Sequence, residues 1–337
     1  MDAQSATNTA VGEVAMDEEC WFSDGNIVII AGGDYCLSRA EAESETMYGC
    51  PVVRVTDPPQ GFRVFLSLVL KPDFVTLFRS PLSATPSPTL SFATLATTIR
   101  IAHKYQMDNV LEPAIARLVQ FFAPGDSWAD LQMSHTKRWE LWRRRSNLEV
   151  EPEDSIEAVE IFRLVDKTEC LPFALYICCL CGPAVLRDGV KRQDGTIMRL
   201  SDEDFARCIQ GSLALSKECH IIVQRALETV ENQFYNISET CTAEQNRCKE
   251  SFKQMAKVHA VNRTIYPLCD VFVPIDCRNP LPSPYNSWKN PLCNSCSRWL
   301  RTSSTTLCKD LFLELPKFLG LSPLMVLKSP TKYLGMK

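Results

Sequence analysis

The stretch GCPVVRVTDPPQGFRVFLSLVL at residues 49–70 decides the fold that we expect for this chain. Its β-branched run at residues 52–55 is typical of a strand. The TDPPQ that follows predicts a helix start, with Asp57 as N-cap, Pro58 at the first helical position and Gln60 completing a capping box. Apolar residues then recur at helical spacing, and they are Phe62, Phe65, Leu66, Val69 and Leu70.

The sequence on either side extends this strand and helix into a larger module. The apolar run NIVIIA at residues 26–31 has the character of a strand that pairs beside the first one. Pro113 either marks the start of a later helix near Glu112 or kinks that helix. We therefore expect a sheet edge with helices and no obvious catalytic residue. Two more stripes of helical period follow, namely Phe92, Leu95, Ile99 and Ala102, then Leu111, Ile115, Leu118 and Phe122.

Three segments of this module resemble the BTB/POZ domain, and in particular the BTB-containing proteins expanded in mushroom-forming (basidiomycete) fungi. They are FSDGNIVIIA at 22–31, GCPVVRVTD at 49–57 and IAHKYQM at 101–107. The later LPKFLGL at 315–321 is similar to the closing motif of that group. The resemblance covers nearly the whole chain after the first 20 residues, and it implies a protein-interaction module without catalytic residues.

The chain departs from the family pattern between its first strand and Gly49. The family has a second strand, an F-x-V-H-x-x-x-L segment and a helix there, whereas this chain has only the polar, Ala/Glu-rich residues 32–48. About two dozen family positions are missing, which is roughly one strand and one or two helices. In BTB domains that segment builds much of the dimer face, so we expect a truncated BTB/POZ-like module.

The fold class that we predict is α+β and mostly helical, with this truncated module followed by a helical C-terminal region. Residues 171–186 are almost wholly apolar, but they contain Pro and Gly and fall short of a membrane span, so a buried core helix is expected. The predicted divisions are a disordered tail at 1–19, the BTB/POZ-like domain at 20–124, a linker at 125–152, the helical region at 153–322 and a tail at 323–337.

Composition narrows the class of protein. The net charge of −4 and the pI near 5.7 argue against a general nucleic-acid binder, which is usually basic. Residues 1–20 are polar and acidic and lack the pattern of a signal peptide. The 16 cysteines are therefore interpreted as reduced thiols of an intracellular protein, cytoplasmic or nuclear.

One basic run has two interpretations. The sequence KRWELWRRR at residues 137–145 interleaves five basic residues with two tryptophans. Such a run is a candidate nuclear-import or phosphate-binding patch. It also fits a linker helix whose tryptophans pack on the body of the protein while the arginines stay solvated.

One cysteine pair has the spacing of a metal site. Cys293 and Cys296 form a C-x-x-C pair, which can place two thiolates on one zinc tetrahedron. Cys269, Cys277 and Cys308 lie close enough in sequence to supply further ligands, with Cys269 or Cys277 preferred. Against zinc, there is only one such pair, and free cysteines often fill space in a core. The cluster CCLC at 178–181 is assigned to the core because it lies inside the apolar run.

No pattern in the sequence predicts an enzyme. There is no phosphate-cradling glycine loop, G-x-S-x-G or H-E-x-x-H, and the adjacent Cys219 and His220 would point apart on a helix. We expect no cofactor. The predicted function, implied by the resemblance, is protein–protein interaction through self-association, a cullin-type ubiquitin ligase or transcriptional partners, without membrane or nucleic-acid binding. The alternative is a zinc-binding or nucleic-acid-associated regulatory protein.

Overall fold

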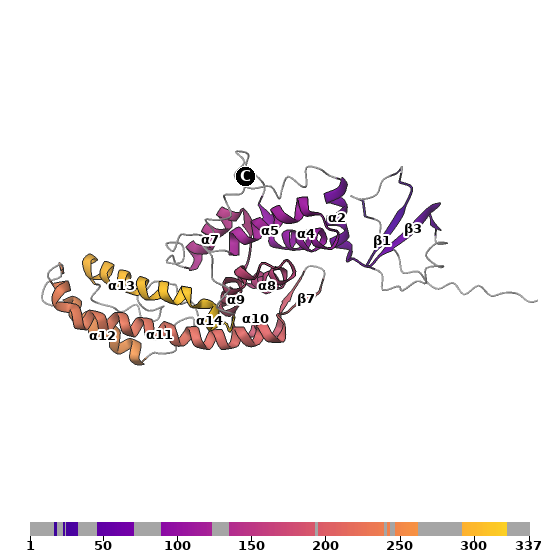
Figure 1. The fold of residues 1–337 in the computed structure, drawn as a ribbon. Coiled ribbons are helices and arrows are strands. Elements are labelled where there is room, and N and C mark those ends of the chain that lie inside the picture. Colours follow the sequence, from indigo (N-terminus) through magenta and orange to yellow (C-terminus); the bar gives the residue numbers. More distant parts are fainter. Residues whose placement is uncertain are drawn as a thin grey trace, which may run out of the picture.

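The structure is a computed structural model, and it describes much of the chain with several gaps. The described residues are 17–18, 23, 25–32, 46–70, 89–122, 135–192, 195–238, 241–242, 247–261 and 292–321. They form an elongated molecule with a small sheet at one end and a group of long helices at the other (Figure 1).

Helices hold 69% of the described residues, so the predicted mostly helical α+β fold is confirmed at that level. The α-helices are α2 (Pro59–Leu70), α4 (Phe92–Lys104), α5 (Asp108–Phe122), α7 (His135–Ser146), α8 (Ser155–Leu164), α9 (Leu171–Leu180), α10 (Pro183–Asp188), α11 (Asp202–Ser238), α12 (Arg247–Val261), α13 (Asn294–Leu313) and α14 (Leu315–Phe318). Short 3-10 turns, η1 (Pro152–Asp154) and η2 (Thr168–Cys170), precede α8 and α9.

The strands form three small sheets. They are β1 (Val28–Ala31), β2 (Thr46–Met47), β3 (Cys50–Val55), β4 (Leu90–Ser91), β5 (Leu148–Glu149), β6 (Val190–Lys191) and β7 (Ile197–Met198). In the first sheet β3 lies in the middle, with β1 parallel on one side and β2 antiparallel on the other. The expected pairing of the 26–31 strand with the 49–55 strand is therefore confirmed, and Val28 lies opposite Val52.

The start of α2 differs from the sequence prediction. The helix begins at Pro59. Both carboxylate oxygens of Asp57, the expected N-cap, accept hydrogen bonds from α4, one from Lys104 Nζ at 2.6 Å and one from the Tyr105 hydroxyl at 2.7 Å. Asp57 thus ties the start of α2 to the end of α4.

The predicted buried stripe of α2 is only partly correct. Val69 and Leu70 are 53% and 48% exposed, while Val64 and Leu68 are buried. The face that carries Val64 and Leu68 packs on the main core together with α4, so the helix is rotated relative to the simple apolar stripe. Phe62, also in the predicted stripe, is buried as expected.

The two later stripes are confirmed. All eight of their residues are buried on α4 and α5, which pack against each other. The side chain of Ser91 caps α4 by accepting the backbone N–H of Thr94 at 3.2 Å. Pro113 lies inside α5, which begins five residues before it at Asp108.

Residues 135–150, in the predicted linker, pack into the same hydrophobic core as the predicted domains on either side. Trp139 and Trp142 of α7 are buried, and both rings meet Phe121 edge-on. Strand β5 pairs in parallel with β4, so it lies beside the start of α4. One hydrophobic core runs from Val64 on α2 to Leu321 after α14, and it crosses the predicted boundaries at residues 124 and 152.

The apolar run at 171–186 is buried as expected through Cys179, whereas Pro183 and Ala184 near its end are exposed. It forms α9, buried over nearly its full length, and then breaks at Gly182, where φ is +85°, before α10. Pro172 falls in the first turn of α9, where a missing N–H costs no helical hydrogen bond. In the part of the chain that the structure describes, no helix combines the length and the apolarity that crossing a membrane requires.

Helix α11 is the longest described element, with 37 residues. Its first turn is capped by Ser201, whose Oγ accepts the backbone N–H of Asp204 at 3.2 Å. Helices α12 and α13 both pack on α11, and the three run alongside one another away from the body (Figure 1). We call α12, α13 and residues 220–238 of α11 the helical arm. Helix α13 starts at Asn294, directly after Cys293.

Candidate functional site

Four cysteine sulfurs meet close to the end of α11 and the starts of α12 and α13. Cys241 follows the end of α11, and Cys248 lies in the first turn of α12. Cys293 is the N-cap residue of α13, and Cys296 lies in the first turn of that helix. All four sulfurs lie within 4.8 Å of one another. We call these four residues the thiol cluster.

The thiol cluster contains the predicted C-x-x-C pair with partners that the sequence reasoning missed. Cys293 and Cys296 are joined by Cys241 and Cys248, whereas Cys269 and Cys277 lie outside the described residues. Cys308 does not belong to the cluster. It lies 12 residues beyond Cys296 on the same helix, or about 18 Å along its axis, where it is buried in the main core.

The cluster is half-sheltered from solvent. Cys248 and Cys296 are fully buried, while Cys241 and Cys293 are partly exposed. The sulfurs of Cys241 and Cys293 are 3.9 Å apart, and the backbone N–H of Cys293 donates to Cys248 Sγ at 3.3 Å. This arrangement brings four soft donors together from three segments of chain.

The protein environment separates the pKa values of these thiols. Burial raises the pKa of Cys248 to about 11 and also raises the pKa of Cys296. For Cys293 burial acts in the same direction, but hydrogen bonds from the backbone N–H groups of Cys296 and Thr242 and from the Thr242 side chain outweigh it and lower the pKa to about 6. The thiolate of Cys293 is therefore favoured near neutral pH, and a thiolate is the form that binds metals.

A signal for the missed pair was present in the sequence. Cys241 and Cys248 are separated by six residues and lie outside the apolar stripe of the preceding helix. Sequence proximity favoured Cys269 and Cys277 instead, because the return of α13 along α11 is not visible in a local pattern.

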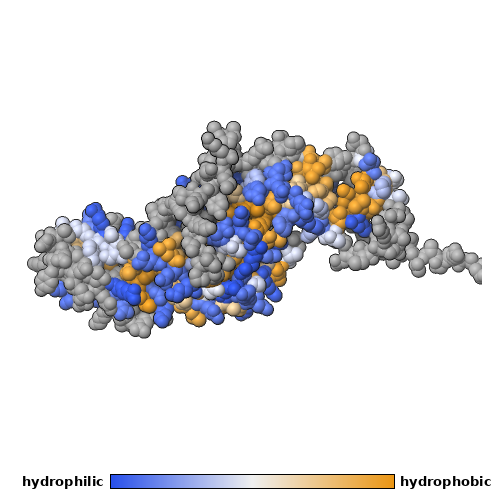
Figure 2. All heavy atoms as spheres, in the orientation of Figure 1, coloured by the Kyte–Doolittle hydropathy of each residue, from blue (hydrophilic) through white to orange (hydrophobic). Residues whose placement is uncertain are grey.

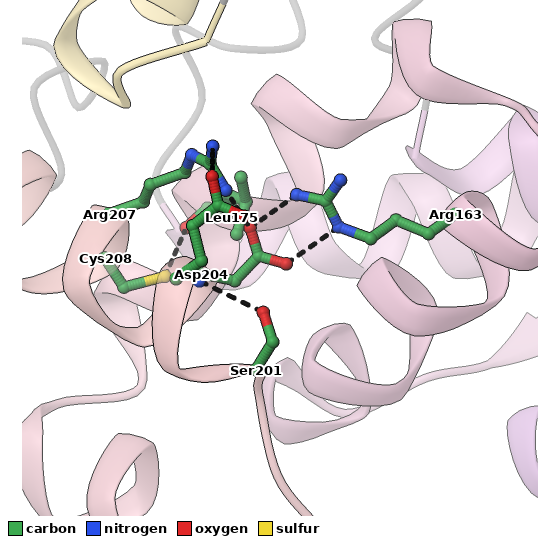
Figure 3. A network of polar contacts seen from close by, with 7 residues as sticks. Arg163, Leu175, Ser201, Asp204, Arg207 and Cys208 are labelled. Atoms are coloured by element: carbon green, nitrogen blue, oxygen red, sulfur yellow. Dashed lines mark hydrogen bonds and ion pairs between the residues drawn. The ribbon is translucent and has the colours of Figure 1, made fainter.

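A second polar group, centred on Asp204, holds α8 against α11 (Figure 3). Asp204 is 2% exposed and accepts two hydrogen bonds from Arg163, at 2.6 Å and 2.8 Å. Arg207 donates a third at 3.0 Å and also pairs with Glu203. The three hydrogen bonds that the Asp204 carboxylate accepts here all come from arginines, so the group is suited to structural ion pairing. Asp202, Glu203 and Asp204 all lie in the first turn of α11, where negative charge is favoured, and Asp204 has this tertiary role in addition.

Two arginines of the basic run on α7 make contacts inside the protein. Arg138 is buried over the ring of Trp142, with its guanidinium carbon 5.4 Å from the ring centroid. Arg143 donates to the backbone carbonyl of Val150 and to Glu151. The buried tryptophans match the interpretation of 137–145 as a packed helix, but the expectation that its arginines stay solvated is wrong for Arg138, which is buried.

The first sheet has apolar side chains on both faces. Val28, Ile30 and Val52 form a small buried cluster on one face. On the other face Ile29 and Val53, which lie opposite each other across the strands, are 37% and 42% exposed. Figure 2 shows hydrophobic atoms at this end of the molecule, over β1 and β3.

Comparisons of this chain with protein-family models, curated proteins and solved structures gave no match. The BTB/POZ resemblance therefore stays a prediction from the sequence motifs.

Proposed function

We propose that this chain is a non-enzymatic protein–protein interaction protein of BTB/POZ type, with a dimerisation or adaptor role. The observation that carries the proposal is the exposed apolar face of the first sheet. Parallel strands are normally covered on both faces, and here Ile29 and Val53 lie open within the described residues. The sequence motifs at 22–31 and 49–57, which carry the family resemblance, include both of these strands.

A second copy of the chain is the partner to which we assign this face. Strand β1 is at the edge of the β1-β3-β2 sheet. An edge strand can pair with a strand of another chain, and two identical edges can pair antiparallel about a twofold axis. Such pairing would also join the exposed side chains of Ile29 from the two copies into one larger apolar surface.

The mass of the full-length protein in solution tests this assignment. Light scattering after gel filtration is expected to give a dimer for the wild type. Ile29→Lys and Val53→Lys should weaken dimerisation at least about tenfold, because each places a charge in the contact. Ile197→Lys is the matched control, since Ile197 is an exposed apolar residue on a separate hairpin. Circular dichroism verifies that each variant is folded.

The outcomes separate the two roles. A wild type that is monomeric at all concentrations rejects dimerisation and leaves only an adaptor role with a different protein. The partners that the family resemblance implies are a cullin-type ubiquitin ligase or transcriptional regulators, in the cytoplasm or the nucleus. Direct binding of a purified cullin, lost in Val53→Lys and kept in Ile197→Lys, would support the first of these.

The second candidate function is a metal-dependent regulatory protein associated with nucleic acid. The thiol cluster favours its metal-binding half. Its association with nucleic acid would depend on the basic run at residues 137–145. In that run Arg138 is buried and Arg143 is paired with Glu151. Retention on DNA or RNA that falls steeply with salt, and that weakens in Arg144→Glu, would support this candidate.

A further inference from the structure

We propose that the thiol cluster binds one Zn²⁺ ion in a closed tetrahedral site that fastens the tip of the helical arm. The inference concerns the arm alone, and it stands whether or not the first sheet dimerises or the chain binds nucleic acid. It begins from the geometry of four sulfurs that come from three separate segments of chain.

The distances between the sulfurs fit a zinc tetrahedron. Zn–S bonds of about 2.3 Å in tetrahedral geometry place the sulfurs about 3.8 Å apart. The sulfurs of Cys241 and Cys293 are 3.9 Å apart, and no pair in the cluster exceeds 4.8 Å. A disulfide requires about 2.05 Å, and all four cysteines are free. Separations of at most 4.8 Å would have to shorten to about 3.8 Å for all four sulfurs to bond one central ion.

One backbone group in the cluster is placed to stabilise a sulfur anion. Cys248 accepts the backbone N–H of Cys293 at 3.3 Å. Donors of this kind orient metal ligands and offset their charge.

Two helix N-termini add to this effect. Cys248 is the second residue of α12, and Cys293 immediately precedes α13. The partial positive charge at each N-terminus favours anions. Four thiolates and one Zn²⁺ carry a net charge of −2, so both helices contribute stabilisation of the correct sign.

The donor set selects the metal class and the role. Four thiolates suit soft or borderline ions and exclude Mg²⁺ and Ca²⁺, which require oxygen ligands. With four protein ligands no coordination position stays open for substrate, which is the arrangement of a structural site. Zinc binds thiolates, so binding displaces the proton of each cysteine that is still a thiol, and the affinity falls as the pH is lowered.

The arm has a physical reason to use a metal. Its buried side chains near the tip include Phe252 and Met255 on α12 and Leu300 on α13, and none of them belongs to the main core. So small an apolar core gives limited stability by itself. Zinc joins Cys248 to Cys293 across 44 intervening residues and thereby fixes where α13 starts relative to α12.

Metal analysis of the full-length protein tests the proposal. The protein is purified under reducing conditions without chelator, and plasma mass spectrometry is expected to find about one zinc ion per chain. Cys248→Ser and Cys296→Ser should lower the zinc affinity, measured by competition with a chromophoric chelator, by at least about tenfold. The matched control is Cys181→Ser, which alters a half-buried thiol in the body and should keep full zinc.

Cobalt substitution keeps the test valid if a variant fails to fold. Wild-type protein stripped of metal and supplied with Co²⁺ should develop sulfur-to-cobalt charge-transfer bands and the intense visible bands of a tetrahedral site. Wild type that contains no zinc and shows no such bands overturns the proposal. So does iron as the resident metal, full zinc in Cys296→Ser, or a disulfide between Cys241 and Cys293 found by peptide mapping of the reduced preparation.

Discussion

Asp204 joins α8 to α11 through side chains alone, and its neutralisation has a predictable cost. Asp204→Asn keeps the shape but removes the charge that Arg163 and Arg207 bind. We expect the free energy of unfolding to fall by about 2 kcal/mol, the range for hydrogen bonds to charged groups. Urea denaturation measures this loss. Glu203→Gln, at a largely exposed position beside it, should cost much less.

The same residue makes part of the stability depend on pH. Burial alone raises the pKa of Asp204, but the hydrogen bonds and charges of Arg163 and Arg207 outweigh it and hold the pKa below its ordinary value. The folded pKa is thus lower than the unfolded one, so the contribution is fully present above about pH 4 and is lost as the pH falls. The difference between wild type and Asp204→Asn should therefore shrink in acid, and a constant difference down to pH 2.5 would contradict this assignment.

At the scale of the element, α7 offers a comparison of two tryptophans in one helix. The indole N–H of Trp139 donates to the carbonyl of Val150 at 2.8 Å, whereas that of Trp142 has no hydrogen-bond partner in the described structure. Both rings are buried, so replacement by Phe removes similar volume from each site. Trp139→Phe should cost about 1 kcal/mol more than Trp142→Phe, because only it breaks a buried hydrogen bond. Thermal unfolding of the two variants is the measurement, and equal midpoints would count against the bond.

Elements with strong local signals were predictable. The stripes at Phe92 to Ala102 and Leu111 to Phe122 follow the helical period and are buried as that period requires. The stripe of α2 was less reliable, because Val69 and Leu70 are apolar yet exposed. Which face of a short helix is buried depends on what packs against it, and this is set by α4 and not by the sequence of α2.

The thiol cluster shows the limit of local reasoning for the site. The C-x-x-C spacing of Cys293 and Cys296 is a local pattern and was recognised. Cys248 lies 45 positions before Cys293, and the two meet only because α12 and α13 both pack along α11. Such a meeting depends on tertiary packing, which no motif of a few residues encodes.

At the scale of the molecule, the continuous core predicts how the chain responds to truncation. Phe121 and Phe122 at the end of α5 pack on Trp139 and Phe162, which lie beyond residue 124. A fragment of residues 1–124 would expose these rings, and we expect it to aggregate or to lack a cooperative unfolding transition. A fragment that ends at residue 321 keeps the entire core and should unfold cooperatively. Calorimetry of the two fragments distinguishes these outcomes, and a stable 1–124 fragment would show that the core is divisible.

Helix α11 sets the distance between the main core and the thiol cluster. Its 37 residues span about 55 Å as one element, from the ion pairs of Asp204 in the body to the thiol cluster at the tip. A helix holds its two ends at a nearly constant separation. The ends of a flexible linker with the same number of residues would on average lie much closer together. Any molecule held at the tip would therefore stay at a set distance from one held at the first sheet, and α11 would act as a spacer between the two.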